Sequence, residues 1–382
     1  MDHFLTPKQK AIRNAARAFC EREIVPVAKD LDTENRFPWE IVEEMGKLGF
    51  FGLQAPKEYG GSGLDSVSAA LVVEEVSRAS AGLGLCVSVH NSVCLYPILA
   101  FGNDDQKKKW VPPLAKGEKI GAFCLTEPNA GSDASGIEST AIPDDKGYVI
   151  NANKVYVTNG AVADICLIFA RTDPSAGRKG ISVVIAERGM EGFSSGELED
   201  MCGMRPNPVT SIRLYDCRVP KDNLLGKEGM GLRIGLAGLD TGRIGIAAQA
   251  LGISCAAKDA AIKYANQRRQ FGVPIAKHQA IQFMIADMAT RIDAARLLIY
   301  RACGQKDRGE DFGQAAAMAK LFSTETSSFV TDLAIQVHGG YGYSKSYHVE
   351  RYYRDARITR IYEGSAEVHR MVIARGVLSK EA

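Results

Sequence analysis

The sequence contains nine cysteines but no arrangement of them that would make a disulfide framework or a metal site. They are scattered along the chain, with no Cys-x-x-Cys pair and no close grouping with histidine. An odd and dispersed set is typical of reduced, buried thiols and not of disulfides or zinc ligands. We therefore predict structural cysteines and no metal site.

We also find no targeting signal and no long apolar run in the sequence. The first ten residues, MDHFLTPKQK, have neither the basic region nor the apolar core of a signal peptide. We find no apolar run near the ~20 residues that span a bilayer, and the most apolar strand-like stretch, 161–170, is short and contains Asp164. We expect a cytoplasmic protein, or one of the mitochondrial matrix if the chain is a mature eukaryotic form.

An excess of one charge is absent as well. The 47 Lys and Arg residues nearly balance the 45 Asp and Glu residues, which leaves a formal net charge of +2. This balance provides no electrostatic reason to expect a nucleic-acid or anionic-membrane partner. The chain has 382 residues, more than the ~250–300 at which a single core stops growing, so we expect more than one core.

The order of sequence patterns predicts an α+β fold in three parts. There is no internal repeat, and there is no strand–helix alternation of the kind that predicts a doubly wound sheet. Residues 1–118 are helical in pattern, beginning with an N-cap and proline at Thr6-Pro7. Residues 119–228 contain short apolar runs bounded by Gly, Pro, Asn and Asp, which are typical of an antiparallel barrel or sandwich, and we predict an antiparallel β-barrel. Residues 229–382 carry four stretches with apolar residues at helical spacing, which predict a four-helix bundle; they are 244–270, 277–307, 314–337 and 367–378.

Two segments of the predicted β-domain could hold a ligand. The loop LTEPNAGSD, 125–133, follows a predicted strand, and its exposed backbone N–H groups can hold an anion or the polar edge of a heterocycle. The alternative is a polar β-turn. The segment KVYVTNG, 154–160, places an aromatic residue and a threonine on a strand, where they can wall a flat ring. The alternative there is a half-buried strand end.

Three segments of the helical region can also be interpreted either as part of a ligand site or as ordinary structural features. In Asp240–Arg243 we predict that Asp240 caps the following helix and that Arg243 lies in its first turn. An arginine there opposes the helix dipole, so either an acidic ligand or a buried carboxylate accounts for it, or it is a solvated surface residue. Arg268 ends the same predicted helix, as an ordinary cap or as a phosphate ligand. The glycines of 336–343 permit close approach to a ligand, while His338 lacks the partners of a triad or a metal site.

Glu363 is the candidate general base. It lies between Tyr362 and Gly364, ahead of the last predicted helix. A carboxylate that is buried among apolar and aromatic neighbours has a raised pKa, which suits a base that works near neutral pH. The alternative is a capping glutamate in a loop.

Taken together, these segments resemble the acyl-CoA dehydrogenase family, and most closely its short-chain (butyryl-CoA) members. The similar pieces extend in order over essentially the whole chain; they are LTEPNAGSD, K-x-x-x-TNG, LDTGRIGIAAQALG, R-x-QFG, QVHGGYGY, RDARIT and IYEGSAEVHR. The resemblance implies an N-terminal helical domain, a middle β-domain and a C-terminal bundle, with FAD between the last two. It also implies a homotetramer built from two dimers, because a neighbouring subunit supplies part of the FAD site in this family.

The resemblance also implies the residues of each site. Those for FAD are Phe123, Cys124, Leu125, Thr126, Gly131, Ser132, Tyr156, Val157, Thr158, Arg268, Phe271, Gln279, Gln336, Val337, His338, Gly339, Gly340, Ser365, Ala366 and Glu367. Those for the acyl-CoA are Ser132, Asp240, Thr241, Gly242, Arg243, Tyr362 and Gly364. The implied catalytic residue is Glu363, since a minority branch carries its glutamate at the position of Gly242, which here has no side chain.

The implied reaction is the FAD-dependent α,β-dehydrogenation of a butyryl-CoA-like substrate to the trans-2-enoyl-CoA. Glu363 takes the α-proton, the β-hydride goes to flavin N5, and the electrons pass to an electron-transferring flavoprotein. The implied donors to the thioester carbonyl are a flavin ribityl hydroxyl and the backbone N–H of Glu363.

Four alternatives remain open at this stage. The first is a dehydrogenase of branched short-chain acyl-CoAs, and the second is an acyl-CoA oxidase, which oxygen consumption would identify. The third is a flavoprotein of the same fold that acts in DNA alkylation damage, which the intact Glu363 and the small net charge oppose. The fourth is a helical scaffold without a cofactor, which a yellow purified protein would exclude.

Overall fold

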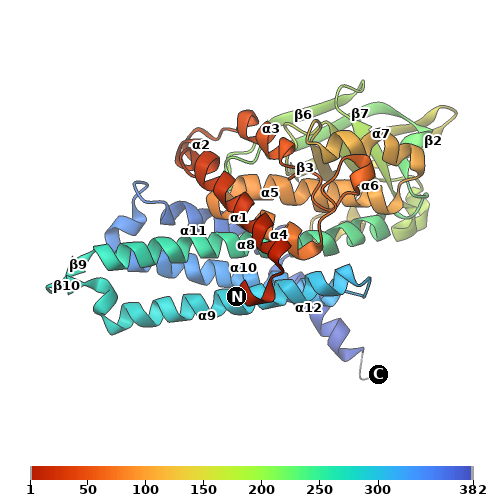
Figure 1. Ribbon diagram of the computed structural model, residues 1–382. Coiled ribbons are helices and arrows are strands. Elements are labelled where there is room, and N and C mark those ends of the chain that lie inside the picture. The colour runs from red at the N-terminus through yellow and green to blue at the C-terminus, as the bar shows by residue number, and fades with distance from the viewer. Residues whose placement is uncertain (1, 380–382) are drawn as a thin grey trace.

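The N-terminal third is helical, as predicted. The computed structural model describes residues 2–379, and its first helices pack along one side of the molecule (Figure 1). They are α1 (Pro7–Phe19), α2 (Ala28–Glu34), α3 (Trp39–Lys47), α4 (Ser66–Ala79), α5 (Ala81–Val89), α6 (Tyr96–Phe101) and α7 (Asp104–Ala115), with the π-helical turns η2 (Cys20–Ile24) and η4 (His90–Leu95). Helix α1 begins where the sequence indicates, because the Thr6 side chain accepts a hydrogen bond from Gln9 N and completes a capping box.

The middle region is a mixed sheet and not the closed antiparallel barrel that we predicted. Its strands are β1 (Gly121–Cys124), β2 (Thr140–Asp144), β3 (Gly147–Val157), β4 (Ile165–Arg171), β5 (Ile181–Glu187), β6 (Phe193–Leu198), β7 (Thr210–Pro220) and β8 (Leu224–Leu225). The strand order is β6-β7-β3-β2-β4-β5-β8, and β1 pairs with β4 outside this path. Strand β4 lies parallel to both β1 and β2. It is buried along almost its whole length, which suits a strand covered on both faces better than the half-exposed strand of a small barrel.

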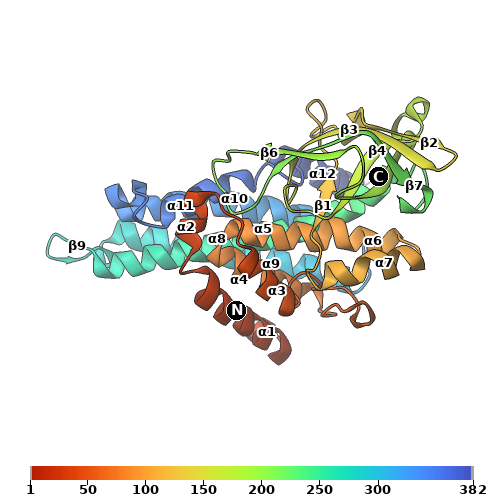
Figure 2. The ribbon, with the colours of Figure 1, turned by 90° about the horizontal axis from the view of Figure 1, so that it is seen from above.

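The C-terminal region is helical, as predicted, although the described residues include one short helix, Val349–Ile358, that we did not predict. Its helices are α8 (Gly231–Gln267), α9 (Gln279–Asp307), α10 (Gly313–His338), α11 (Val349–Ile358) and α12 (Ala366–Leu378). Helix α8 runs through the centre beside α4, α9 and α10, as seen from above in Figure 2. The short hairpin of β9 (Arg269–Gln270) and β10 (Val273–Pro274) follows α8 at the end far from the sheet.

The predicted start of the first bundle helix was wrong. Helix α8 begins at Gly231 and not at Ile244, so Asp240 and Arg243 lie inside it and Asp240 is not an N-cap. The glycines in the first half of α8 are positions of close packing: a Cβ on Gly235 would lie 3.0 Å from the Phe169 ring. Their packing against the sheet and the neighbouring helices offsets the low helix propensity of glycine.

The statement that no apolar run approaches a membrane span was also wrong. The helical segment Ala81–Phe101 has 21 residues and a mean hydropathy of 1.5, enough by length and composition to cross a membrane. In the fold, 78% of this stretch is buried against other elements. It therefore has the burial of a core helix, and its length and composition alone are weak evidence for a membrane span.

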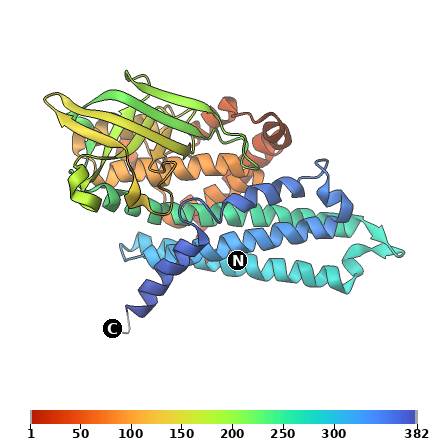
Figure 3. The same cartoon turned by 180° about the vertical axis from the view of Figure 1, so that it is seen from behind.

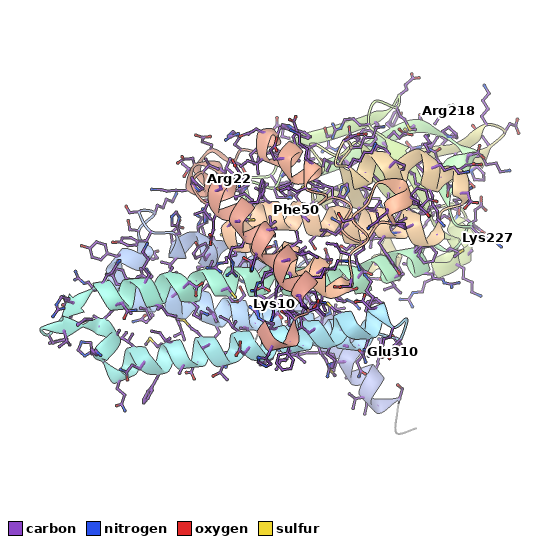
Figure 4. All side chains as sticks on the ribbon, in the orientation of Figure 1. Lys10, Arg22, Phe50, Arg218, Lys227 and Glu310 are labelled. Carbon is purple, nitrogen blue, oxygen red and sulfur yellow. The ribbon has the colours of Figure 1, made fainter. Side chains whose placement is uncertain are left out.

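Buried apolar side chains link the three regions. One cluster joins α1 and α4 to α8, α9 and α10, and another joins the helices α6 and α7 to strands β4 and β5. Eight of the nine cysteines are buried within this interior, and Cys202 is exposed. Many charged side chains lie outside it, as with Arg218 and Lys227 at the sheet end and Glu310 beyond α9 in Figure 4.

Candidate active site

A cavity of about 220 Å³ lies where the sheet, the helix pair α5 and α8, and the turn before α12 meet. In Figure 3 that turn leads into α12, which projects from the body toward the C-terminus. The lining residues are Leu85, Val89, Val93, Phe123, Leu125, Thr126, Gly131, Ser132, Ala134, Tyr156, Thr158, Leu236, Leu239, Arg243, Tyr362, Glu363, Gly364 and Val368. The cavity thus brings together residues from all three regions of the chain, and eleven of them belong to the sets that the resemblance implied.

An unusual backbone turn places Glu363 at this cavity. Glu363 has φ 52° and Gly364 has φ 95°, so two successive residues adopt left-handed conformations. The left-handed region costs a non-glycine residue about 1–2 kcal/mol, and such strain is often found at functional sites. Glycine at position 364 also avoids a tight contact, because a Cβ there would lie 3.1 Å from the His369 ring.

The Glu363 carboxylate is buried without a hydrogen bond. Neither Oε1 nor Oε2 has a partner among the residues that the structure describes. Space for the carboxylate comes from Gly242 on α8, where a Cβ would overlap Oε2 and lie 3.0 Å from Cδ. Burial raises the pKa of Glu363 to about 7, although the positive charges of Lys320 and Arg243 act to lower it. A carboxylate in this state can accept a proton near neutral pH.

Arg243 is buried and is not the solvated surface arginine that the sequence left open. It forms an ion pair with Asp240, one turn earlier on α8, and its side chain is only 7% exposed. Burial raises the pKa of the Asp240 carboxyl, and the Arg243 charge opposes that shift. The guanidinium also reaches the cavity wall, where it supplies positive charge beside Glu363.

The opposite wall comes from the ends of β1 and β3. Tyr156 is 64% exposed and has φ 53°, and Thr158 lies beside it on the cavity. The side chains of Cys124 and Val157 face the sheet core instead, so they can approach a ligand only through their backbone. Beneath the wall, the buried Lys154 donates to the Glu127 carboxylate (2.6 Å) and to Leu125 O (3.2 Å), which holds the loop after β1 in place.

The remaining FAD candidates gather at the other end of the bundle. Arg268, Gln336, Val337, His338, Gly339 and Gly340 line a second cavity of about 510 Å³ with Tyr264 and Tyr341. His338 stacks on Tyr264 with ring centroids 4.3 Å apart, and the Arg268 guanidinium lies 5.7 Å from the Tyr341 ring centroid. Arg268 follows Arg243 by 25 residues, which is about 38 Å at 1.5 Å per helical residue. Within one chain, this cluster therefore lies far from the Glu363 cavity.

The other predicted residues have varied surroundings. Phe271 is 94% exposed in the β9–β10 hairpin and Gln279 opens α9, so both lie at the end of the bundle that carries Arg268. Ser365 caps α12, accepting a hydrogen bond from Val368 N, while Ala366 is buried and Glu367 is exposed. Thr241 lines a separate cavity on the other side of α8.

Sequence reasoning missed the apolar cavity wall and one buried lysine. Leu85, Val89 and Val93 carry no signal that separates a cavity wall from an ordinary core. Lys320 did carry a signal: it lies in an apolar stretch, AAAMAKLF, of a predicted helix. Its side chain is fully buried, and its ammonium donates to Tyr362 O (2.8 Å) and Gly364 O (2.6 Å), the carbonyls on either side of Glu363.

Family models match nearly the whole chain in three consecutive parts. The acyl-CoA dehydrogenase N-terminal domain matches residues 6–118, the middle domain 122–217 and the C-terminal domain 229–378. Among curated relatives, the short-chain specific acyl-CoA dehydrogenase of Clostridium acetobutylicum is 46% identical over 98% of this chain and 99% of its own. The NADH-dependent acryloyl-CoA reductase of Anaerotignum propionicum is 45% identical over 100% of this chain and 97% of its own.

Solved structures give the same result. Butyryl-CoA dehydrogenase from Megasphaera elsdenii superposes with a TM-score of 0.96 at 43% identity, covering 98% of this chain and 99% of its own. A chain solved in work on the electron-transferring flavoprotein of Acidaminococcus fermentans has a TM-score of 0.97 at 46% identity, with 99% and 100% covered. An acyl-CoA dehydrogenase from Bacillus anthracis, solved with FAD, has a TM-score of 0.93 at 34% identity, with 99% and 68% covered.

Proposed function

This chain belongs to the acyl-CoA dehydrogenase family, and from that membership we propose that it dehydrogenates a short-chain acyl-CoA with FAD as acceptor and Glu363 as base. The observation that carries the proposal is the Glu363 carboxylate, which is buried and lacks a hydrogen-bond partner in the described part of the chain. It faces Gly242 at the wall of a cavity that is otherwise lined mainly by apolar groups.

The residues around the cavity suit a flat ring system. Tyr156 on β3, Thr158 just after this strand, and Phe123 and Thr126 at the end of β1 line one side of the cavity, and Glu363 lies on the turn before α12. A Cβ on Gly131 would meet no atom within 4 Å, so the loop leaves room for a ligand to approach its backbone. Bound FAD supplies the acceptor for the hydride that leaves the β-carbon of the substrate.

The chain's own groups account for the proton half of the reaction. The α-proton of a thioester is weakly acidic, so the developing enolate needs hydrogen-bond donors while the carboxylate of Glu363 takes the proton. We assign one of these donors to the backbone N–H of Glu363. The buried position of the carboxylate keeps it away from solvent water. The double bond forms between the α- and β-carbons as the proton and the hydride leave.

The apolar side chains at the cavity suit a short acyl chain. Leu85, Val89 and Val93 on α5 and η4 close one side with apolar atoms. A straight four-carbon chain is the substrate that we propose, and branched chains of four or five carbons are the nearest alternative.

A homotetramer built as a dimer of dimers completes the proposed FAD site. The Arg268 cluster lies about 38 Å along α8 from Arg243, so a second chain must bring its own cluster to the Glu363 cavity. Large apolar side chains are exposed at that end, including Phe271, Tyr341 and Tyr343, as expected for residues that a partner covers.

We also propose an electron-transferring flavoprotein as the electron acceptor. For the domains, we propose boundaries after residues 118 and 228.

The test is an anaerobic assay of flavin reduction. Purified holoenzyme is mixed with straight C4, C6 and C8 acyl-CoAs and with branched C4 and C5 acyl-CoAs, and the loss of flavin absorbance is followed. We expect the highest rate with butyryl-CoA. A protein without flavin, or one whose flavin no acyl-CoA reduces, would contradict the proposal. Rapid oxygen consumption with butyryl-CoA would instead identify an oxidase.

Reduction of an enoyl-CoA is a second candidate, because an acryloyl-CoA reductase is among the relatives at 45% identity. The same residues serve both directions, since a protonated Glu363 returns the proton that the carboxylate removes. Mixing the reduced enzyme with crotonyl-CoA and following flavin reoxidation would measure this direction against dehydrogenation.

A further inference from the structure

Lys320 on α10 has an unusual environment for a lysine. Its side chain is fully buried, and no carboxylate lies within ion-pair distance of it in residues 2–379. Lysine is almost never fully buried without a partner, because burial removes the hydration of the ammonium. Here two backbone carbonyls replace that water, those of Tyr362 and Gly364. The buried ammonium therefore holds the short turn of residues 362–364 in place.

The two carbonyls flank the candidate base on both sides. The Tyr362 carbonyl belongs to the peptide that ends at the Glu363 N–H, and the Gly364 carbonyl belongs to the next peptide but one. The peptide bonds are trans, so the C=O and N–H of one peptide point in opposite directions. By holding Tyr362 O, the ammonium thus directs the Glu363 N–H away from α10. This N–H donates to no protein acceptor in the described residues.

Lys320 also acts on the turn through its charge. The ammonium lies beside the carbonyls of Tyr362 and Gly364, which flank the left-handed residue Glu363, and its positive charge favours these carbonyls electrostatically. Hydrogen bonds to a charged donor are about twice as strong as neutral ones. The carbonyl oxygen of Tyr362 is polarised in this way, which makes the N–H at the other end of the same peptide a stronger donor.

We propose that Lys320 is a positioning residue, whose ammonium holds the Tyr362 and Gly364 carbonyls and thereby aims both the Glu363 carboxylate and the Glu363 N–H at the acyl-CoA. This inference rests on the proposed function, since it assigns the geometry of the same base. Lys320 acts through the two carbonyls, with which its ammonium forms hydrogen bonds.

The experiment compares two variants of Lys320 in the holoenzyme, by anaerobic flavin reduction with butyryl-CoA. Lys320→Ala leaves a hole the size of the side chain, and a displaced turn lowers the reduction rate on the order of 10²-fold, with little change in KM. Ethylammonium ions fit that hole and restore part of the rate. Lys320→Met fills the same space without a donor or a charge, so it is slow and ethylammonium does not restore it.

The pH profile separates positioning from a general loss of stability. The charged groups that face the Glu363 carboxylate are Lys320 from α10 and Arg243 from α8, and both lower its pKa. His369 on α12 is kept neutral, because burial lowers its pKa to about 3. The negative charge of Glu367 acts on Lys320, whose pKa it raises. Loss of the Lys320 charge therefore raises the pKa of Glu363 above about 7. The acidic limb of the rate profile moves to higher pH in both variants and returns with ethylammonium in Lys320→Ala.

Lys306→Met is the matched control. Lys306 is a partly buried lysine on α9 that donates to Gln54 Oε1 (2.7 Å) beside a different cavity, so its loss leaves the rate and the acidic limb in place. Wild-type rates in the Lys320 variants, or slow rates without rescue and without a shifted limb, overturn the inference. Failure of both variants to fold overturns it too, because Lys320 is then a folding residue. An inactive Glu363→Gln beside active Lys320 variants leaves the proposed function standing, whereas an active Glu363→Gln removes it.

Discussion

The exchange of Gly242 for alanine isolates the space that the Glu363 carboxylate occupies. A Cβ at position 242 would overlap Glu363 Oε2, lie 3.0 Å from Cδ and lie 3.2 Å from Val93 Cγ1. The carboxylate is the end of a flexible side chain, so it can move aside by about 1 Å without unfolding the turn. Alanine inside a helix is also favoured over glycine by about 0.5–1 kcal/mol. The fold should therefore tolerate the change.

Catalysis should not tolerate it. A displacement of about 1 Å between a base and its proton costs on the order of 10²-fold in rate, which is about 2.7 kcal/mol at 1.36 kcal/mol per factor of ten. We expect Gly242→Ala to keep its flavin and its melting temperature and to lose about 10²-fold in the rate of flavin reduction by butyryl-CoA. Stopped-flow measurement of that rate at saturating substrate is the assay.

Gly245→Ala is the matched control on the same helix. Its Cβ would overlap Ser88 Oγ and lie 3.4 Å from Ser88 Cβ, so it too meets the end of a small flexible side chain. Ser88 lines a separate cavity of about 480 Å³ on the other side of the helix. The control should therefore reduce its flavin at the wild-type rate. Equal rates in Gly242→Ala and Gly245→Ala would refute the reasoning, because the space beside the carboxylate would then not matter.

Three further predictions follow from other parts of the structure. Burial raises the pKa of Glu363 to about 7, so the flavin reduction rate should fall as the pH drops through about 7; a rate that stays constant down to pH 5 would contradict the raised pKa. Arg268→Glu should weaken FAD binding in titrations of apoprotein, although Arg268 lies far from Glu363 on its own chain; unchanged affinity would argue against a cofactor site shared between chains. Glu127→Gln leaves the fully buried Lys154 without its carboxylate and should lower the free energy of unfolding in urea by about 3–5 kcal/mol; a loss below 1 kcal/mol would show that this ion pair is unimportant.

The sequence predicted those parts of the molecule whose local patterns agree with their tertiary setting. The cap at Thr6 and the apolar spacing of α9 and α10 specify helices that packing then stabilises. The first half of α8 was missed because its glycines have low helix propensity, and only their close contacts with the sheet and with Glu363 make glycine the suitable residue there. The open path of the sheet could not be foreseen either, because strand order depends on pairings between distant segments.

In the candidate site too, some residues could be predicted from the sequence and others could not. Motifs with unusual residues, such as Tyr362-Glu363-Gly364, could be found in the sequence because a charged residue beside glycine is conspicuous. The role of Gly242 as an empty space and of Lys320 as a donor to two carbonyls could not, because both depend on a contact between α8 or α10 and a turn that follows much later in the chain. The cavity wall of Leu85 and Val89 looks like core in sequence, since the same apolar residues serve both purposes.

Anaerobic flavin reduction in Glu363→Gln, set beside the wild type, tests the central claim most directly. Glutamine keeps the size of the side chain and removes its ability to take a proton, so the variant should purify with bound flavin. On mixing with butyryl-CoA we predict that the wild-type flavin loses its absorbance and the variant flavin does not. Reduction of the variant flavin at the wild-type rate would contradict the assignment of Glu363 as the base.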